Sequence, residues 1–244
     1  MIKFENTEVT GWEAAIRGMR NPMNSWNKSD SGYRCSATEP PRYIIGPNDL
    51  KLMKSLVRAG SDHSKFMRMI NVTVDITAPM YWWKEFDTYK VGTVRNSCST
   101  MHKIHDKEFT ADDFSFEHLS ELDGVNGKPF HEDTLTNTDT KWFSGLILHT
   151  LNKARKLYIQ TKDKRYWWCM IQLLPSSYNQ RSTVQLNYAV LRNMYHSRKN
   201  HKLDEWSVDF CNWAKTLPYS EFIVDDFKGA IMNIDKVNYG ALNK

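Results

Sequence analysis

One segment in the first third of the chain alternates strictly between apolar and polar residues. The apolar members are Ile70, Val72, Val74 and Ile76, and the polar members between them are Asn71, Thr73 and Asp75. Because successive side chains of a strand point to opposite faces, this pattern predicts a strand with one buried face. A helix over Met80–Tyr89 is expected next, with the Thr77 hydroxyl as its N-cap and Pro79 in its first turn.

Apolar residues at intervals of three and four predict several further helices, most of them in the last hundred residues. The expected helices are Asp49–Ala59, Phe143–Gln160, Tyr166–Leu174, Thr183–Arg198 and Asp204–Leu217. A strand in the first half and helices in the second indicate an α+β domain.

Two stretches lack such periodicity. Residues 1–47 are expected to be rich in loops and end in two consecutive prolines, Pro40 and Pro41, which favour an extended path. Residues 103–141 are dense in turn-forming residues and are expected to form a polar surface excursion. Both stretches are taken as parts of one domain that covers residues 1–244.

Composition excludes several classes of protein. The chain has 244 residues, 41% of them apolar, and 33 Lys and Arg against 28 Asp and Glu, which is typical of one globular domain. No apolar run approaches the roughly 20 residues of a membrane span, and a cytoplasmic protein is expected because no secretory signal pattern opens the chain. The mildly basic charge suits a small anion such as a phosphate as well as it suits nucleic acid, so charge alone does not decide between them, and nucleic acid is the less expected partner.

The cysteines and histidines do not form a metal motif. Four cysteines are scattered without a C-x-x-C pair, which indicates reduced thiols. Cys169, which lies among Trp167, Trp168 and Met170, is expected to be buried. His102 and His105 are three residues apart with no carboxylate that completes a ligand set, so no metal is expected.

Two of the predicted helices carry polar side chains that share a face. On Thr183–Arg198, Asn187 and Arg198 differ by about 20° in azimuth and border an apolar stripe, which suits a flat polar ligand. The alternative is a core stripe whose arginine reaches solvent. On Met80–Tyr89, Lys84 faces a possible ligand or forms a surface ion pair with Asp87.

The segment Lys90–Ser99 mixes glycine, hydroxyls and cations, a combination that presents donors to a phosphate. It contains neither a Walker sequence nor a dinucleotide-binding fingerprint.

The order of these pieces resembles the signature region of flavin-dependent thymidylate synthases. The resemblance rests on His63, the alternating strand, Ala78-Pro79, Lys84-Glu85-Phe86, Lys90-Val91-Gly92-Thr93-Val94, and the downstream Leu174-Pro175, Tyr178, Asn187, Leu191, Arg198 and His201. It spans residues 49–227. It implies an α+β fold with an antiparallel or mixed sheet and a helical C-terminal half, in a homotetramer that binds FAD and a pyrimidine deoxynucleotide. Methylene-tetrahydrofolate and NADPH would be the co-substrates of C5 methylation.

The resemblance also assigns roles position by position. Arg198 matches the catalytic arginine that holds and polarises the uracil. The residues that match flavin-site positions are His63, Lys90, Asn187 and Asn193, and those at the nucleotide site are Lys84, Glu85 and Arg95. The family's Arg-His-Arg-x-x-Ser sequence reads Thr88-Tyr89-Lys90-Val91-Gly92-Thr93 here, so one of its two cations is kept.

These matches and departures leave open what the chain does. The first hypothesis is a divergent enzyme that transfers a one-carbon unit to a pyrimidine nucleotide. The second is a non-catalytic member of the same fold that binds a nucleotide or another protein. A weaker third is nucleic-acid binding through the basic excess, which predicts salt-dependent retention on DNA.

Overall fold

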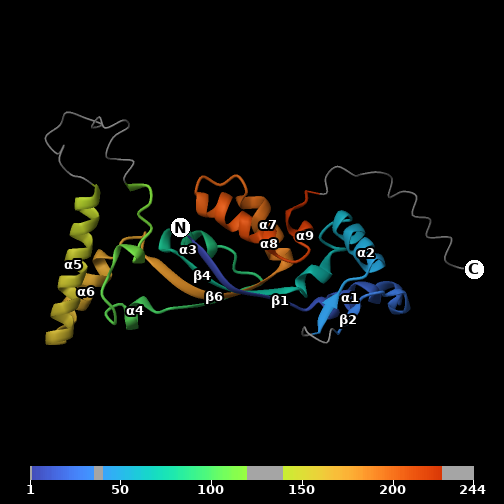
Figure 1. The fold of residues 1–244 in the computed structure, drawn as a ribbon, viewed down its shortest axis with the longest axis horizontal. Coiled ribbons are helices and arrows are strands. Elements are labelled where there is room, and N and C mark those ends of the chain that lie inside the picture. The colour runs from blue at the N-terminus through green and yellow to red at the C-terminus, as the bar shows by residue number, and fades with distance from the viewer. Residues whose placement is uncertain (1, 36–40, 120–139, 227–244) are drawn as a thin grey trace, which may run out of the picture. The chain divides into compact units, whose positions relative to one another are not determined.

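The computed structural model describes residues 2–35, 41–119 and 140–226 (Figure 1). The chain divides into two compact units, each described here by itself. Unit 1 comprises Met1–Thr7 and Thr73–Gln185, and unit 2 comprises Glu8–Val72 and Leu186–Lys244. The expectation of a single domain stays a prediction.

A four-stranded sheet has the strand order β1-β4-β6-β5. Its strands are β1 (Lys3–Thr10), β4 (Asn71–Pro79), β6 (Asn179–Asn187) and β5 (Thr93–Ser97), so β5 lies at an edge. In β4 the buried and partly exposed residues alternate from Asn71 to Ala78, which confirms the predicted strand.

The exposed face of this sheet carries a polar network that joins three strands. Asp75 accepts hydrogen bonds from Asn6 Nδ2 at 2.9 Å, Thr183 Oγ1 at 2.6 Å and an Arg181 guanidinium nitrogen at 2.8 Å. These bonds, from Thr183, Asn6 and Arg181, hold the pKa of Asp75 well below its usual range. The Arg181 charge is therefore committed to neighbouring strands.

The helix predicted after β4 is present but begins differently. β4 continues through Thr77, so this residue is not the expected N-cap, and α3 (Met80–Phe86) starts with Pro79 at its N-cap position. In place of a side-chain cap, a backbone hydrogen bond fixes the first turn of α3: Met80 N–H donates to the carbonyl of Tyr178, the residue before β6, at 3.0 Å. Trp82, Trp83 and Phe86 are buried on one side of α3.

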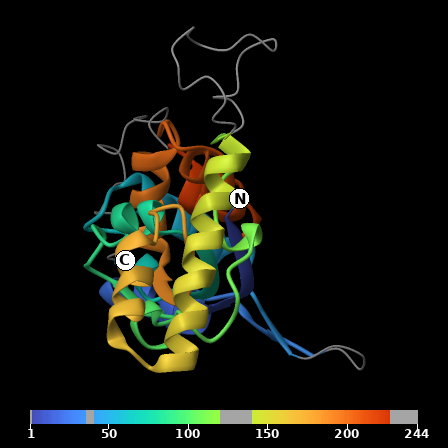
Figure 2. The same ribbon diagram turned by 90° about the vertical axis from the view of Figure 1, so that its left-hand side faces the viewer.

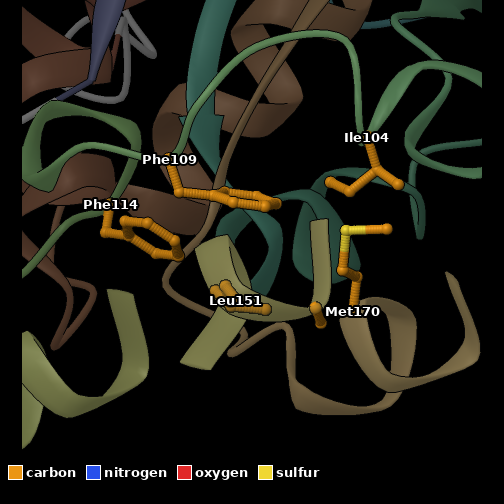
Figure 3. Close-up of a cluster of buried hydrophobic side chains, with 6 residues drawn as sticks. Ile104, Phe109, Phe114, Leu151 and Met170 are labelled. Atoms are coloured by element: carbon orange, nitrogen blue, oxygen red, sulfur yellow. The ribbon is translucent and has the colours of Figure 1, made fainter. Parts of the chain in front are cut away.

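Helices α5 (Thr140–Thr161) and α6 (Lys164–Leu173) confirm two of the predicted helices. They lie side by side (Figure 2). A buried cluster joins them to the segment before them (Figure 3); its members are Ile104, Phe109, Phe114, Leu151, Ala154 and Met170.

That cluster corrects the expected surface excursion of residues 103–141. The segment follows α4 (Thr100–Lys103), and its part up to residue 119 contains the 3-10 turn η4 (Ala111–Asp113) and three core residues. Asn152 of α5 fixes this path, because its amide accepts from Phe109 N–H and donates to the Phe109 carbonyl, both at 2.9 Å. Burial of a few apolar side chains therefore packs this segment against the helices, although most of its residues are polar. The remainder, residues 120–139, lies outside the described residues.

The expected loop-rich start is wrong. After β1 come α1 (Trp12–Arg20), two 3-10 turns (η1, Asn21–Met23; η2, Trp26–Lys28) and the antiparallel pair β2 (Gly32–Arg34) and β3 (Arg42–Ile44). Helix α1 forms because Ala15, Ile16 and Met19 give it one buried stripe.

A buried ion pair ties α1 to α2 (Pro47–Arg58), a helix that the sequence predicted. Arg20 Nε donates to Asp49 Oδ1 at 2.6 Å, and Asp49 is 0% exposed. The other carboxylate oxygen accepts from the hydroxyls of Ser29 and Ser31 at 2.7 and 2.6 Å. Burial alone would raise the pKa of Asp49, but the hydrogen bonds from Ser31, Ser29 and Arg20 outweigh it and hold this pKa below its usual value.

The predicted helix Thr183–Arg198 is wrong in its first third. Buried Ser182, Val184 and Leu186 alternate with exposed neighbours, so this part belongs to β6, and α7 (Tyr188–Arg198) begins only afterwards. The helix predicted over Asp204–Leu217 is confirmed as a π-helical turn (η7, Glu205–Phe210) that continues into α8 (Cys211–Thr216). The 3-10 turn η3 (Lys65–Arg68) and the short α9 (Glu221–Val224) complete unit 2.

The cysteines are all free thiols, and three of them are exposed. Cys169 is one of these, contrary to the expected burial. In this turn of α6 the neighbouring Met170 is the residue that packs into the buried cluster. Within the described residues, no group of three His, Cys, Asp or Glu side chains is placed to hold a metal ion. Nor does any helix of the described ranges have the length and apolarity needed to cross a bilayer.

Candidate functional site

The eight residues singled out from the sequence fall four in each unit. His63, Asn187, Asn193 and Arg198 belong to unit 2, and Lys84, Glu85, Lys90 and Arg95 belong to unit 1. The surroundings of each group are therefore described within its own unit.

Asn187 is the N-cap of α7 and not a member of the helical stripe proposed from the sequence. Its side-chain oxygen accepts a hydrogen bond from Val190 N–H at 3.1 Å. Its amide nitrogen makes no hydrogen bond within the part of the chain that the structure describes. One end of this half-buried side chain therefore stabilises the helix, and the other end retains two N–H donors.

Arg198 lies at the opposite end of α7. Its guanidinium lies over the ring of Trp206, 5.2 Å from the ring centroid, and the side chain is half-buried. Eleven residues separate it from Asn187, which at 1.5 Å per residue places the two about 16 Å apart along the helix. At this separation the two side chains cannot border the same flat ring, as the helical stripe predicted from the sequence required.

The other two candidates of unit 2 are exposed. Asn193 lies on the face of α7 opposite the buried Leu191. His63 lies in the turn between α2 and η3, where its backbone N–H donates to the Gly60 carbonyl at 3.2 Å.

Arg95 of β5 is engaged by its own chain. One terminal nitrogen donates to both carboxylate oxygens of Asp87 at 2.9 Å, Nε donates to Ser182 Oγ at 2.9 Å, and the other terminal nitrogen donates to Gln180 Oε1 at 2.6 Å. The guanidinium also lies 3.8 Å from the ring centroid of Trp83. Four of its five N–H donors are thus occupied. Asp87 pairs with Arg95, whereas the sequence suggested Lys84 as its partner.

Lys84 and Lys90 are exposed, and Glu85 is half-buried. The turn that carries Lys90 is fixed by Gly92, whose φ of 78° lies in the left-handed region, and by a hydrogen bond from the Thr93 hydroxyl to the Tyr89 carbonyl. These lysines are point charges that can reach an anion from the surface.

A cavity of about 450 Å³ in unit 1 is bordered by Cys98, Ser99 and Thr100, which follow β5. Lys103 and Lys107, a few residues further along the chain, also line it, and its remaining wall includes Tyr178, which is so distant in the sequence that no local pattern predicted it. Lys103 pairs with Asp106 at 2.9 Å, and Lys107 pairs with Asp113. Burial, with smaller contributions from Asp113 and Cys98, raises the pKa of Tyr178.

Unit 2 contains a larger cavity of about 870 Å³ that the sequence also missed. Aromatic and charged side chains line it, namely Trp12, Glu13, Arg17, Tyr33, Arg42, Tyr43 and Tyr219. The only available signal was the aromatic content of 13%, which does not say where the rings gather. His63, Asn187, Asn193 and Arg198 do not line this cavity.

Comparison with known proteins gives matches in structure alone. No model of a known protein family matches the sequence, and no curated protein matches it. A crystal structure of thymidylate synthase X (ThyX) from Helicobacter pylori with FAD and dUMP superposes with a TM-score of 0.59 and 16% identity, over 94% of this chain and 100% of that one.

A second structural match is a UMP/dUMP methylase, PolB, from Streptomyces cacaoi bound with 5-Br dUMP. It has a TM-score of 0.54 and 14% identity, over 88% of this chain and 91% of that one. The chain therefore has the fold of the flavin-dependent thymidylate synthases, as the resemblance of its motifs indicated. At these identities the likeness establishes the fold, and the reaction has to be argued from the residues.

Proposed function

We propose that the chain is a divergent enzyme of the thymidylate synthase X type that transfers a one-carbon unit to C5 of a pyrimidine deoxynucleotide, dUMP or a related one. The observation that carries the proposal is the fold, since the structural match covers 94% of the chain. Within this fold, an asparagine and an arginine lie at the two ends of α7. The two structural neighbours are described as complexes with dUMP or its 5-bromo derivative, so both support a pyrimidine nucleotide as ligand.

The donor chemistry of these residues suits a flavin. A flavin ring presents carbonyl oxygens and an N–H at one edge, and the amide nitrogen of Asn187 has two N–H donors without partners among the described residues. The exposed Lys90 supplies a cation for a phosphate group. Asn187, Asn193, His63 and Lys90 are the residues that would hold FAD, and FAD would supply the redox chemistry of the one-carbon transfer with NADPH and methylene-tetrahydrofolate as co-substrates.

Arg198 is the residue proposed to act on the base. A fixed guanidinium beside a uracil carbonyl stabilises the negative charge that develops on the ring when C5 becomes nucleophilic. Its position over Trp206 restricts its rotamers, so the charge is oriented before a ligand arrives. Lys84 and Glu85 are proposed to contact the nucleotide outside its ring.

Flavin uptake is the first test. Purified protein is incubated with FAD, freed of excess FAD and examined for absorbance near about 450 nm, where oxidised flavins absorb. A retained flavin band that depends on Asn187 is expected. A protein that remains colourless after this treatment contradicts the flavin-dependent reaction.

Arg198→Ala is the second test, with Arg68→Ala as an exposed arginine control in the same unit. Loss of a charge-assisted contact is expected to weaken dUMP binding about 10- to 150-fold and to abolish turnover, because such a contact contributes about 1.5–3 kcal/mol. Calorimetric titration with dUMP measures the affinity. If both variants bind dUMP as the parent does, the assignment of Arg198 is wrong.

A non-catalytic nucleotide-binding or protein-binding role is the second candidate, and Arg95 is the observation that favours it. Arg95 lies in the segment Lys90–Ser99 that was expected to bind a phosphate, but its guanidinium bonds to Asp87 and Gln180 of the same chain. This segment therefore has fewer cations for a phosphate. Thermal stability separates the two candidates, because a ligand at about 100 times its Kd adds about 2.7 kcal/mol to the free energy of unfolding. Stabilisation by dUMP but not by FAD favours the non-catalytic role, and stabilisation by both favours the enzyme.

A further inference from the structure

The net positive charge of the chain is concentrated in one short segment. Residues 153–165, the turn between α5 and α6 with the adjoining ends of both helices, are called the basic tip. They carry six cations, namely Lys153, Arg155, Lys156, Lys162, Lys164 and Arg165, against the single acid Asp163. This excess of five equals the formal net charge of the whole chain, so the remainder of the sequence is formally neutral.

Most of these cations are available to a partner. Lys153, Lys156, Lys162 and Lys164 are exposed, and none of the four forms an ion pair with another described residue. Asp163 is occupied by Arg165, whose guanidinium lies 2.6 Å from it. The tip therefore presents four uncompensated lysine charges within about two helical turns on either side of the bend.

Aromatic rings lie among the lysines. Lys162 Nζ lies 5.8 Å from the ring centroid of Tyr158, and Lys164 Nζ lies 6.0 Å from that of Trp168. Trp168 is 46% exposed, and it packs edge-on against Trp167 with 5.1 Å between the ring centroids. Trp167 is itself held by a hydrogen bond from Nε1 to the Met101 carbonyl at 3.1 Å. An exposed indole on a fixed neighbour offers a surface on which a planar base can stack.

The hairpin that carries the tip is held in place by packing. The buried cluster in Figure 3 joins Leu151 and Ala154 of α5 to Met170 of α6 and to the segment around Phe109. Arg155 adds hydrogen bonds to the carbonyls of His105 and Asp106 at 2.9 and 3.2 Å. The lysines are therefore displayed on an ordered helical hairpin (Figure 2), so little backbone ordering is required on binding.

From this arrangement we propose that the basic tip and the adjacent Trp168 form a binding surface for single-stranded nucleic acid, in which the four lysines neutralise phosphates and Trp168 stacks on a base. A single strand is favoured over a duplex because an exposed indole can stack only on a base that is not already stacked between its neighbours. It is favoured over a lipid surface because the exposed apolar residues of this region, Ile159 and Trp168, are too few to insert as an apolar face. The proposal is independent of the reaction proposed above.

The first experiment measures the affinity of the full chain for a fluorescein-labelled oligothymidylate of about 20 nucleotides by fluorescence anisotropy. Each phosphate neutralised contributes about −0.7 to the slope of log K against log salt on a single strand, so four lysines predict a slope of about −3. Between about 50 and 200 mM salt the affinity is then expected to fall about 50-fold. A slope near zero, or no measurable binding at the lowest salt, overturns the proposal.

Two variants separate the lysines from the ring. Replacing Lys153, Lys156, Lys162 and Lys164 together by glutamine is expected to bring the slope close to zero. Trp168→Ala is expected to weaken binding about tenfold and to leave the slope unchanged, because a stacked base is not a charge contact. The matched control replaces four exposed lysines elsewhere, Lys3, Lys28, Lys51 and Lys202, by glutamine and is expected to bind as the parent does. Thermal unfolding followed by circular dichroism confirms that each variant is folded.

Competitors decide between the possible partners. An unlabelled single strand is expected to displace the probe at lower concentration than a duplex of the same length or vesicles of about 30% phosphatidylserine. A duplex that competes as well as the single strand, or vesicles that compete better, overturns the assignment. So does a control variant that loses as much affinity as the tip variant, because the binding would then follow net charge alone.

Discussion

Replacing Arg95 tests whether this residue belongs to the nucleotide site or to the framework of unit 1. The structure places its guanidinium between Asp87, Gln180 and Ser182 and over Trp83, so that one side chain joins α3, β5 and β6. Only 17% of the Arg95 side chain is exposed, against 55% of Asp87. Arg95→Ala removes all of these contacts at once.

The expected cost follows from the individual contacts. The pair with the exposed Asp87 contributes about 0.5 kcal/mol, since solvent screens it. The hydrogen bonds to Gln180 and Ser182 contribute about 1 kcal/mol each, and the contact with Trp83 about 1 kcal/mol. Because such contributions are not strictly additive, Arg95→Ala is expected to lower the free energy of unfolding by about 2–4 kcal/mol.

Urea unfolding followed by tryptophan fluorescence measures this change, and titration with dUMP measures binding in the same variants. Arg95→Lys serves as the control, because it keeps the charge but loses the planar fork that bonds three partners. Both variants are expected to be less stable than the parent, the alanine variant more so. If Arg95→Ala unfolds at the same urea concentration as the parent but no longer binds dUMP, the reasoning is refuted and Arg95 is a substrate ligand.

Two further predictions concern unit 2. Asp49→Asn is expected to lower the free energy of unfolding by about 3–5 kcal/mol, because it leaves the buried charge of Arg20 unpaired. Urea unfolding measures this loss of stability, and a loss below about 1 kcal/mol would contradict the prediction. Since the pKa of Asp49 is lowered in the folded state, its stabilisation is present above about pH 4 and is lost as the pH falls further, so acid unfolding of this variant should depend less on pH than that of the parent. Asn187→Ala removes the cap of α7 and is expected to cost about 1 kcal/mol, whereas Asn187→Asp keeps the acceptor for Val190 N–H but loses the amide donor. Flavin uptake and thermal unfolding of both variants separate the two roles, and unchanged FAD affinity in the aspartate variant would exclude Asn187 from the flavin site.

The elements predicted from the sequence are those whose pattern is set by one continuous buried face. β4 alternates over its whole length, and α2, α5 and α6 keep apolar residues at helical spacing, so local periodicity was sufficient. α1 escaped notice because its apolar stripe is short and lies within a region of Gly, Asn and Ser.

The boundary between β6 and α7 shows a different difficulty. Val184 and Leu186 fit a strand by their alternation, yet they also continue the helical spacing of Leu191 and Met194. The two periods overlap at this junction, and only the pairing of β6 in the sheet decides between them. The geometric argument that placed Asn187 on a helical stripe failed for this reason, although its position next to α7 survives.

The candidate site was least predictable where a side chain finds partners far away in the sequence. Arg95 bonds Gln180, which is 85 residues distant, and no local pattern indicates that pair. The cavities likewise are lined by segments that the sequence separates widely. Residue types and their order indicated the fold, but which cations remain available depends on tertiary contacts.

That availability constrains how this chain can hold an anion. Arg20 and Arg181 are each committed to a carboxylate of another element, as Arg95 is, and a guanidinium that holds two elements together cannot turn to a phosphate without weakening them. In the proposed nucleotide site this leaves Lys84, an exposed point charge without the bidentate geometry of arginine. We therefore expect binding of the phosphate to be weak and strongly reduced by salt. Binding of the base through half-buried Arg198 is expected to depend less on salt, because a partly buried charge is screened less. Comparing the salt dependence of dUMP binding with that of deoxyuridine tests this division, and a nucleotide affinity that does not change with salt would show that a committed arginine leaves its partner for the ligand.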